Sequence, residues 1–501
     1  MAYIGIDVGT TGSKATVIEQ SGKIVLSIYH EYDLEFPKPG YVTMNPDRVW
    51  SAVKRALSEA AAQYGKPIEA IAAASFGEAV VFLGADGKPV CDSIFYTDVR
   101  GTESLPELRA KVDLDDFQYR TGMPVNFMYT LPKLMWVQRN APQILEKTKK
   151  LLPYSSYIAY MLSGEAAADG SLASRMLMFN RLKMDWDYDT LDTFGIARSA
   201  MPKFVPAGAP VGRILPSVAR ELGIKGDPII VSGVHDQIAA ALGSGSLRSG
   251  DMADGIGSAE CISAVLPDEN VDFAGMFRYN ICAEPYAVPG KYLALIFSNT
   301  AGAALKWYRD TFERELRAKC DAAGKNTYAE LNKSLSDAPS PLLFLPHLAG
   351  TGTPYMDSGA KGAVMGLTLA SSKMDLYRAI IEGNNYEMRY NLELLSRFGM
   401  KFDALTAVGG GASPEALRIK ADIFQKPIYM LNTSQGGTVG MVVLCGKAAG
   451  QFASFEEGVA SLVRKTGCVE PDPKYRDRYD EKYAQYKRMY EAARSVYADG
   501  E

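Results

Sequence analysis

The sequence predicts an α/β protein built from two large domains. Its 501 residues exceed the usual size of one domain, and 47% hydrophobic with 22% charged residues is the composition of an ordinary globular chain. Buried apolar strands alternate with amphipathic helices along both halves of the chain. A small-residue stretch near the middle, Gly243 to Gly250, is compatible with a hinge between the two domains.

Composition excludes several classes of protein. A net charge of −4 leaves no basic surface for nucleic acid, and three histidines with six scattered cysteines make a structural zinc site improbable. The chain has no secretory leader pattern and no apolar run of the length that a bilayer needs. We therefore expect a cytoplasmic protein that binds neither nucleic acid nor membrane, and the sequence is compatible with a homodimer.

The chain opens with strands expected at residues 3–8, 14–19 and 24–32, and the first connection is rich in glycine and hydroxyl side chains. This connection, Gly9 to Ser13, allows a tight hairpin whose backbone N–H groups form an anion-binding nest. It has no Walker spacing, because a strand follows it in place of a helix. A plain turn is the alternative. Asp7, just before the glycine, favours a phosphate and metal site.

Two acidic residues follow the ends of expected strands in the first half. A helix begins at Asn45-Pro46-Asp47, and the buried strand 68–75 runs into Phe76-Gly77-Glu78. A later strand ends at Asp98. Ionised carboxylates accept hydrogen bonds from hydroxyl groups, so Glu78 and Asp98 suit a polyhydroxylated ligand. A solvated charge at Glu78 and a salt bridge from Asp98 to Arg100 are the alternatives.

Asp236 occupies the junction between a strand and a helix in the middle of the chain. The apolar segment 227–234 predicts a buried strand, and Ile238 to Leu242 predicts the helix that follows it. Ligands of α/β proteins often bind at such strand ends. Asp236 is thus a candidate for chemistry, and capping of the helix is the alternative.

The second half repeats the opening pattern in reduced form. Asp254-Gly-Ile-Gly-Ser-Ala259 leads into an apolar strand at 261–266, which predicts a second hairpin. A strand at 405–408 ends in three glycines before a helix expected at 414–425, where a phosphate or a flat ligand can approach the backbone. A turn selected for packing is the alternative for these glycines. Further helices are expected at 301–315 and 373–398, and the tyrosines from Tyr475 to Tyr490 predict a docking face on a terminal helix.

Several motifs together resemble the FGGY carbohydrate kinases. They are Asp7-x-Gly9-Thr10-Thr11, His235-Asp236 and the glycine triplet at 409–411. Two longer stretches are similar to the family's signatures: Met128-x-Thr130-x-x-Lys133-Leu134-x-Trp136-Val137-x-Arg139-Asn140, and Gly362-x-Val364-x-Gly366-Leu367 followed after seven residues by Asp375-Leu376-x-x-Ala379-Ile380-Ile381-Glu382.

The resemblance implies two actin-like, ribonuclease-H-type ATPase domains, 1–244 and 245–501, flanking a cleft for ATP and sugar. It implies that Asp236 is the general base and that Mg²⁺ is held by Asp7 and Asp236. The implied substrate-binding residues are Phe76, Gly77, Glu78, Asp98, His235 and Asp236. The implied ATP-binding residues are Thr10, Thr11, Gly12, Lys14, Gly257, Ser258, Gly302, Gly410, Gly411 and Ala412.

The expected activity is transfer of the γ-phosphate of ATP to a hydroxyl group of a small ketose or polyol, with a pentulose such as xylulose or ribulose as first choice. Phe76-Gly77, His235-Asp236 and Gly257-Ser258-Ala259-Glu260 are more similar to deoxysugar kinases of the fuculokinase kind. A deoxyketose, a tetritol or glycerol therefore remains an alternative substrate. An actin-like or chaperone-like ATPase without a sugar substrate is the alternative from another class.

Overall fold

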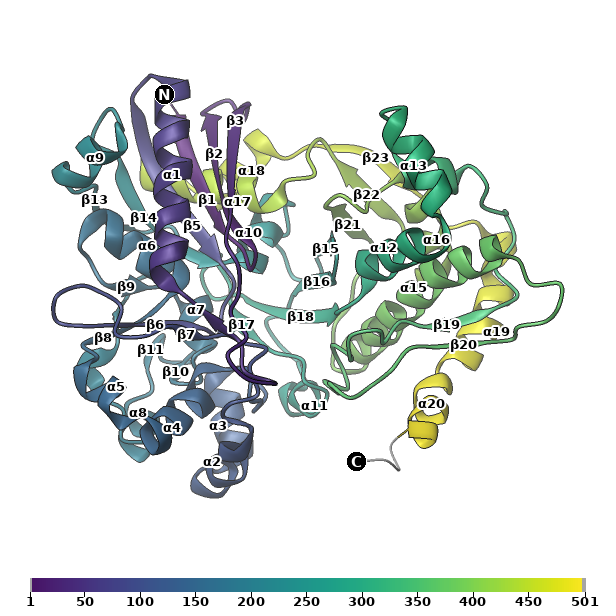
Figure 1. Ribbon diagram of the computed structural model, residues 1–501, viewed down its shortest axis with the longest axis horizontal. Coiled ribbons are helices and arrows are strands. Elements are labelled where there is room, and N and C mark those ends of the chain that lie inside the picture. The colour runs from purple at the N-terminus through teal and green to yellow at the C-terminus, as the bar shows by residue number, and fades with distance from the viewer. Residues whose placement is uncertain (1, 498–501) are drawn as a thin grey trace. The chain divides into compact units, whose positions relative to one another are not determined.

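The structure is a computed structural model that describes residues 2–497 (Figure 1). The chain folds into two compact units that are not contiguous in sequence. The first comprises 2–247, 282–293 and 435–463, and the second 248–281, 294–434 and 464–497. The predicted division at 244/245 lies close to the first crossing, whereas 282–293 and 435–463 belong to the first unit despite their place in the second half of the chain.

Within the described residues, the main sheet of the first unit has six strands. Their order is β13 (Pro210–Arg213), β14 (Ile229–His235), β5 (Ile68–Ser75), β1 (Ala2–Val8), β2 (Gly12–Glu19) and β3 (Ile24–Glu31). β1 pairs antiparallel with β2 and parallel with β5, and β5 pairs parallel with β14. The three opening strands, the strand 68–75 and the strand before Asp236 are thus confirmed, with small shifts at their ends.

Both faces of this sheet are covered, which explains why β1 is apolar along almost its whole length. Ala2, Ile4, Ile6 and Val8 belong to a core with α1 (Pro46–Tyr64) and α6 (Tyr154–Ser163). The intervening residues point to the opposite face, where a Cβ on Gly5 would lie 3.2 Å from the Met441 side chain of α17 (Gly436–Ala448). Asn45 caps α1 as predicted, because its side chain accepts a hydrogen bond from the Arg48 N–H.

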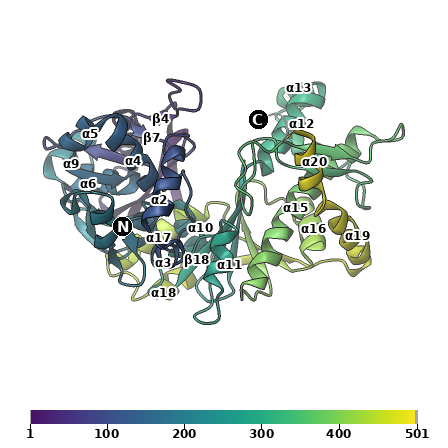
Figure 2. The same cartoon turned by 90° about the horizontal axis from the view of Figure 1, so that it is seen from below.

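Two helices on the second face pack backbone against backbone. A Cβ on Gly243, in α10 (Asp236–Gly243), would lie 1.8 Å from the carbonyl oxygen of Gly436. A Cβ on Gly440 of α17 would lie 1.9 Å from the carbonyl oxygen of Ala239. α10 and α17 therefore require glycine at their crossing, and Figure 2 shows them side by side. Residues 436–448 thereby support the helix that Asp236 begins.

Smaller elements complete the first unit. Its other helices are α2 (Leu105–Lys111), α3 (Leu114–Thr121), α4 (Thr130–Asn140), α5 (Pro142–Lys147), α7 (Gly170–Ser174), α8 (Tyr188–Thr193), α9 (Pro216–Leu222) and α18 (Phe455–Leu462). Its short strands are β4 (Thr43–Met44), β6 (Val80–Leu83), β7 (Ser93–Ile94), β8 (Lys150–Pro153), β9 (Ala167–Ala168), β10 (Phe179–Asn180), β11 (Asp185–Trp186) and β12 (Lys203–Phe204). The region 113–204, expected to be mostly helical, thus also contributes short strand pairs.

The sheet of the second unit repeats the strand order of the first. It runs through β18 (Tyr292–Ser298), β16 (Glu260–Val265), β15 (Met252–Ile256), β21 (Leu405–Val408), β22 (Ile428–Leu431) and β23 (Lys465–Val469), with β17 (Glu284–Pro285) beside β18. β15 pairs antiparallel with β16 and parallel with β21, as β1 does with β2 and β5. When β13 is left out of the first sheet and β17 out of the second, the first five strands of each sheet lie in the order 3-2-1-4-5, which is the actin-like, ribonuclease-H-type arrangement.

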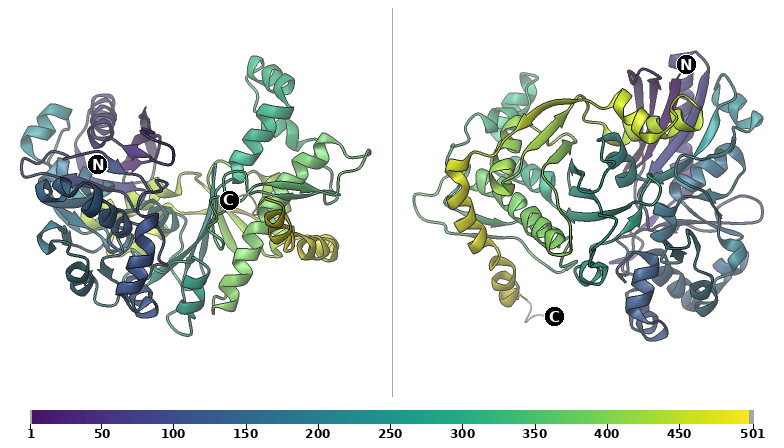
Figure 3. Two further views of the ribbon diagram at one scale, coloured as in Figure 1. Left: turned by 60° about the horizontal axis from the view of Figure 1, so that its bottom comes forward. Right: turned by 180° about the vertical axis from the view of Figure 1, so that it is seen from behind.

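Helices surround this second sheet, as Figure 3 shows. They are α11 (Phe273–Arg278), α12 (Ala301–Phe312), α13 (Arg314–Ala322), α14 (Thr327–Asn332), α15 (Lys373–Arg397), α16 (Pro414–Phe424), α19 (Arg476–Tyr486) and α20 (Met489–Tyr497), with the strand pair β19 (Leu343–Leu345) and β20 (Ala363–Met365). The helix expected at 301–315 is two helices, because α12 ends before Glu313. Among residues 2–497, no helix combines the length and apolar character that crossing a membrane requires.

The tyrosine stripe near the C-terminus is a docking face, as predicted, although it spans two helices. Tyr479, Tyr483, Tyr486 and Tyr490 are buried. The Tyr479 hydroxyl accepts a hydrogen bond from Arg378 of α15 at 2.9 Å. These rings therefore anchor the terminal helices to the core of the second unit.

Candidate active site

Asp236 stands where the central strand β14 ends and α10 begins. His235 occupies the N-cap position and Asp236 is the first helical residue, so its carboxylate is not the capping group. Its side chain is 39% exposed, although most of its surroundings are protein. This desolvation raises the pKa of Asp236, and the negative charges of Asp7 and Glu78 act in the same direction against His235 and Arg175. The carboxylate is therefore accessible and more basic than an ordinary aspartate.

His235 links Asp236 to a buried glutamate. Its Nε2 lies 3.2 Å from Asp236 Oδ1, and its Nδ1 lies 3.0 Å from Glu284 Oε1. Burial and the charge of Arg175 lower the pKa of His235, but the carboxylates of Glu284 and Asp236 outweigh them and raise it. Since both ring nitrogens face carboxylates, His235 orients Asp236 and has no free nitrogen for a ligand.

Arg175 extends this network to the loop after β5. Its Nε lies 3.0 Å from Glu284 Oε2, and its NH1 pairs with Glu78 Oε1. Burial opposes ionisation of Glu284, but the charges of Arg175 and His235 prevail and lower its pKa. Five ionisable side chains therefore form one chain, Glu78–Arg175–Glu284–His235–Asp236, which is buried except at Asp236.

Arg175 and Glu284 were not identified from the sequence. Each is a single charge beside an apolar run, Met176-Leu-Met-Phe179 and Ile281-Cys282-Ala283 respectively. A charge in such a run is buried only with a partner, and this signal was available.

The loop residues Phe76, Gly77 and Glu78 have three different environments. The Phe76 ring is buried in the core, with its centroid 5.3 Å from that of Phe95 and 5.0 Å from that of Tyr154. A Cβ on Gly77 would lie 2.1 Å from Cδ of Arg175, so only glycine lets the guanidinium reach Glu78. Glu78 has a positive φ of 61° and is 6% exposed. The Phe76 ring is thus part of the aromatic core, and its expected contact with a substrate stays a prediction.

Asp98 forms the salt bridge to Arg100 that the sequence analysis gave as the alternative interpretation of this residue. Its carboxylate is fully buried, pairs with Arg100 at 2.6 Å and accepts a hydrogen bond from the Val42 N–H at 2.6 Å. The Arg100 guanidinium also stacks over Tyr41 and Trp136. Both carboxylate oxygens of Asp98 therefore already accept hydrogen bonds from within the protein, and its expected contact with a substrate stays a prediction.

The first signature stretch supports these loops from α4. The Thr130 hydroxyl donates to the backbone oxygen of Glu78, and Lys133 Nζ donates to that of Asp98 at 2.9 Å. Burial lowers the pKa of Lys133 to about 7. Both signature side chains therefore hold backbone in place.

The first glycine hairpin forms as predicted between β1 and β2. The Gly9 N–H donates to the Gly12 carbonyl at 2.9 Å, while Thr10 and Thr11 lie at the surface. Asp7 and Lys14 are partners across the two strands, and Lys14 Nζ lies 3.6 Å from Asp7 Oδ2. A cation and a carboxylate therefore lie beside the turn of this hairpin.

The Asp7 and Asp236 carboxylates fit a Mg²⁺ ion bound together with phosphates. Both side chains are partly exposed, and the Asp7 charge acts on the pKa of Asp236. Within residues 2–497, no three or more His, Cys, Asp or Glu side chains form a metal cage. Mg²⁺ usually takes only one or two carboxylates plus water and substrate phosphates, so this donor set suits it.

The second unit gathers the remaining expected ATP-binding residues. Gly257, Ser258 and Ala259 form an exposed hairpin between β15 and β16. The first N–H groups of α12, from Gly302 and Ala303, donate to the carbonyls of Gly257 and Ser258 at 3.0 and 2.9 Å.

The glycine triplet lies beside the same hairpin. The Gly411 N–H donates to the Ile256 carbonyl at 3.1 Å, and a Cβ on Gly410 would meet nothing within 4 Å. Ala412 follows directly and is partly exposed. Three segments that are distant in sequence thus converge on one surface of the second unit, with open space at Gly410.

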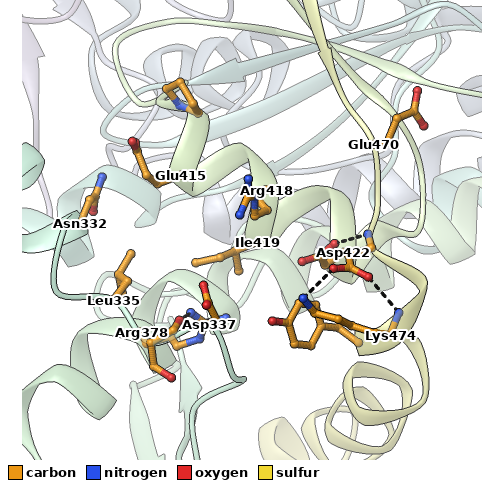
Figure 4. A pocket seen from close by; sticks show the side chains of 14 residues that line it. Asn332, Leu335, Asp337, Arg378, Glu415, Arg418, Ile419, Asp422, Glu470 and Lys474 are labelled. Atoms are coloured by element: carbon orange, nitrogen blue, oxygen red, sulfur yellow. Dashed lines mark hydrogen bonds and ion pairs between the residues drawn. The ribbon is translucent and has the colours of Figure 1, made fainter.

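A separate polar pocket of about 530 Å³ runs along α16 from Pro414 (Figure 4). Asp472 lies in this pocket, where its backbone N–H donates to Asp422 at 2.6 Å and its carboxylate pairs with Lys474 at 2.9 Å. The full lining is Asn332, Leu335, Ser336, Asp337, Arg378, Pro414, Glu415, Arg418, Ile419, Asp422, Glu470, Asp472, Lys474 and Tyr475. Acidic side chains outnumber basic ones in it, so the pocket disfavours a polyphosphate.

Strand order and site chemistry together define a phosphotransferase with two actin-like domains, and comparison with known proteins specifies it further. The sequence matches the FGGY family of carbohydrate kinases, N-terminal domain, over residues 2–243, and the C-terminal domain of the same family over residues 267–449. The chain belongs to this family and is a carbohydrate kinase. This membership removes the alternative of an actin-like or chaperone-like ATPase without a sugar substrate.

Named relatives match along nearly the whole chain. A xylulose kinase of Staphylococcus epidermidis is 27% identical over 504 residues, covering 99% of this chain and 98% of that protein. A gluconokinase of Bacillus subtilis is 27% identical, covering 94% and 93%. The crystal structure of a xyloylose kinase from Brucella ovis is 26% identical with a TM-score of 0.87, covering 99% of this chain and 100% of that one.

Proposed function

We propose that this carbohydrate kinase transfers the γ-phosphoryl group of ATP to a hydroxyl group of a small ketose, with a pentulose such as xylulose or ribulose as its substrate and Asp236 as general base. The observation that carries the proposal is the accessible Asp236 carboxylate, held by His235 at the N-terminus of α10 and close to Asp7 of the first glycine hairpin.

In the proposed reaction the sugar hydroxyl oxygen attacks the γ-phosphorus while the bond from that phosphorus to the β–γ bridging oxygen breaks. The hydroxyl proton passes to Asp236, and ADP leaves with the electron pair of the broken bond. A raised pKa makes Asp236 a stronger base than an ordinary aspartate. The His235 ring, oriented by Glu284, holds that carboxylate in one direction.

Phosphate binding would use the two glycine hairpins. Thr10, Thr11, Gly12 and Lys14 would contact the β- and γ-phosphates from one hairpin, and Gly257 and Ser258 from the other, because exposed N–H and hydroxyl groups bind anions. Adenosine would lie against Gly302 and the segment 410–412. Mg²⁺ held by Asp7 and Asp236 would neutralise charge that develops on the phosphates.

The sugar would lie beside Asp236 and the Gly77–Glu78 turn. The negative charges of Asp7 and Glu78 both act on Asp236, and Arg175 is committed to Glu78 and Glu284. This negative environment favours hydroxyl donors and repels a carboxylate on the substrate. A neutral ketose therefore suits the site better than a sugar acid such as gluconate, despite the similarity to a gluconokinase.

A coupled ADP-release screen tests the substrate. It would include pentuloses, hexuloses, deoxyketoses, tetritols, glycerol and gluconate, with a blank that contains no sugar. We expect kcat/KM to be highest for a pentulose. A higher value for a deoxyketose, a tetritol or glycerol would establish that alternative, and rapid ADP release in the blank would contradict the proposal.

Asp236→Asn tests the base. We expect kcat to fall by about 10²–10⁴-fold, the contribution usual for a general base, while the Kd for ATP stays near that of the wild type. Gln237→Glu, at the next position of the same helix, serves as a control for added or lost charge near the helix N-terminus. Turnover of more than a few per cent in Asp236→Asn would refute the assignment.

A further inference from the structure

A buried ion cluster lies directly beneath the second glycine hairpin. Lys420 Nζ, from the middle of α16, lies 2.6 Å from Asp254 Oδ2 and 2.6 Å from Glu260 Oε1. All three side chains are at most 4% exposed. Asp254 is in β15 and Glu260 begins β16, so the two carboxylates flank the hairpin on its two strands.

The cluster connects two segments that bear on the expected ATP site. The hairpin at 257–259 is exposed between the two carboxylates, while α16 follows the glycine segment 409–412 without interruption. A backbone hydrogen bond from Gly411 to Ile256 joins the same two segments at 3.1 Å. Lys420 therefore makes a second connection between the hairpin and the segment that contains the glycines and α16.

Only the lysine makes this arrangement tolerable. Two carboxylates buried side by side repel one another, and burying either without a cation is strongly unfavourable. Burial raises the pKa of Glu260 to about 7 against the charge of Lys420, and Asp254 adds to the rise. Within the described residues, Asp254 Oδ1 has no hydrogen-bond partner. Loss of the lysine would therefore drive the two strand ends apart.

We propose that Lys420 is a positioning residue for ATP: through Asp254 and Glu260 it holds the Gly257–Ala259 hairpin at a set distance from α16, where the hairpin binds the phosphates. This inference rests on the proposed function, because it assumes that the hairpin contacts ATP. Since Lys420 acts through the hairpin, it affects binding of the polyphosphate far more than binding of the adenosine moiety, and it leaves binding of the sugar unchanged.

Equilibrium binding of ATP and AMP, measured by calorimetry on the full chain, tests the proposal without knowledge of the sugar. We expect Lys420→Met to raise the Kd for ATP at least tenfold and to leave the Kd for AMP within twofold. The double variant Lys420→Met/Glu260→Gln removes the repulsion between the carboxylates. It should reverse at least half of the increase in the logarithm of the Kd for ATP. If the wild type binds AMP but not ATP, the proposed function itself fails.

Glu382→Gln is the matched control, because Glu382 forms a buried pair with Arg378 on α15 in the same unit. We expect it to lower the melting temperature and to leave the Kd for ATP within twofold. An unchanged Kd for ATP in folded Lys420→Met would overturn the proposal. An equal loss of ATP affinity in Glu382→Gln would overturn it as well. If Lys420→Met does not fold, Glu260→Gln, which keeps the Asp254–Lys420 pair, is the deciding variant. We expect it to raise the Kd for ATP threefold or more without raising the Kd for AMP. An unchanged Kd for ATP in this variant would refute the proposal.

Discussion

Replacing Glu284 by glutamine tests whether the charge chain behind Asp236 is one energetic unit. Glu284 is fully buried and contacts both His235 Nδ1 and Arg175 Nε at 3.0 Å. Glutamine keeps the shape of the side chain but loses the charge, and its amide group presents N–H donors to side chains that are themselves donors. Arg175 would then depend on Glu78 alone.

The expected loss is large for a single isosteric change. Removing one partner of a buried ion pair costs about 3–5 kcal/mol, and because glutamine can still accept one hydrogen bond we expect about 3 kcal/mol. For units of this size such a loss lowers the melting temperature by about 6–12 °C. Catalysis should also weaken, because His235 would no longer orient Asp236.

The pH dependence of this loss has a definite sign. The folded-state pKa of Glu284 lies below its ordinary value of 4.5, so its contribution to stability is full above pH 4.5 and disappears as the pH falls through the lowered pKa. The difference in melting temperature between wild type and Glu284→Gln should therefore be constant at neutral pH and shrink in acid.

Scanning calorimetry from pH 3.5 to pH 8 measures both effects. Asp192→Asn is the control, because its pair with Arg198 is more than half exposed, and we expect its melting temperature to stay within about 1 °C of the wild type. A shift below about 2 °C for Glu284→Gln at neutral pH would show that the chain of contacts does not act as a unit.

Three further changes test packing and phosphate binding. Gly440→Ala should prevent stable folding of the first unit, because its Cβ would lie 1.9 Å from a backbone oxygen. Gly437→Ala, one turn earlier, should be tolerated, because its Cβ would meet nothing within 4 Å. Soluble yield and melting temperature distinguish the two variants. Gly77→Ala should displace Arg175 and raise the sugar KM by about tenfold, and an unchanged KM would contradict that placement. Lys14→Met should raise the KM for ATP by about tenfold or more with little change in the sugar KM, and steady-state kinetics with each substrate varied would detect the opposite pattern.

Local patterns predicted much of the fold. Alternating and continuous apolar segments located β1, β2, β3, β5 and β14 in the first sheet and β16 and β21 in the second, whereas β13, β18, β22 and β23 were not predicted. Asn45-Pro46 located the start of α1, because such signals depend only on neighbouring residues. The two glycine hairpins were predictable for the same reason. The junction at Asp236 followed from a buried strand running into an apolar helix.

Side-chain roles were less accessible, because they depend on partners that are distant in sequence. Asp98 looked like a ligand-binding carboxylate at a strand end, but Arg100 and the Val42 N–H occupy it. Phe76 stood in the expected substrate loop, yet its ring belongs to the aromatic core.

The sequence by itself determined the family, two glycine-rich hairpins and a carboxylate at the mouth of a helix. Only the tertiary structure decided what supports them: residues 436–448 return to pack on α10, Arg175 and Glu284 converge behind Asp236, and Lys420 reaches two carboxylates more than 150 residues away, at Asp254 and Glu260. The physical reason is that a buried charge needs an oppositely charged partner, and a close contact between two helix backbones needs a glycine at the crossing. Periodicity along the chain carries no information about which distant residue supplies that partner.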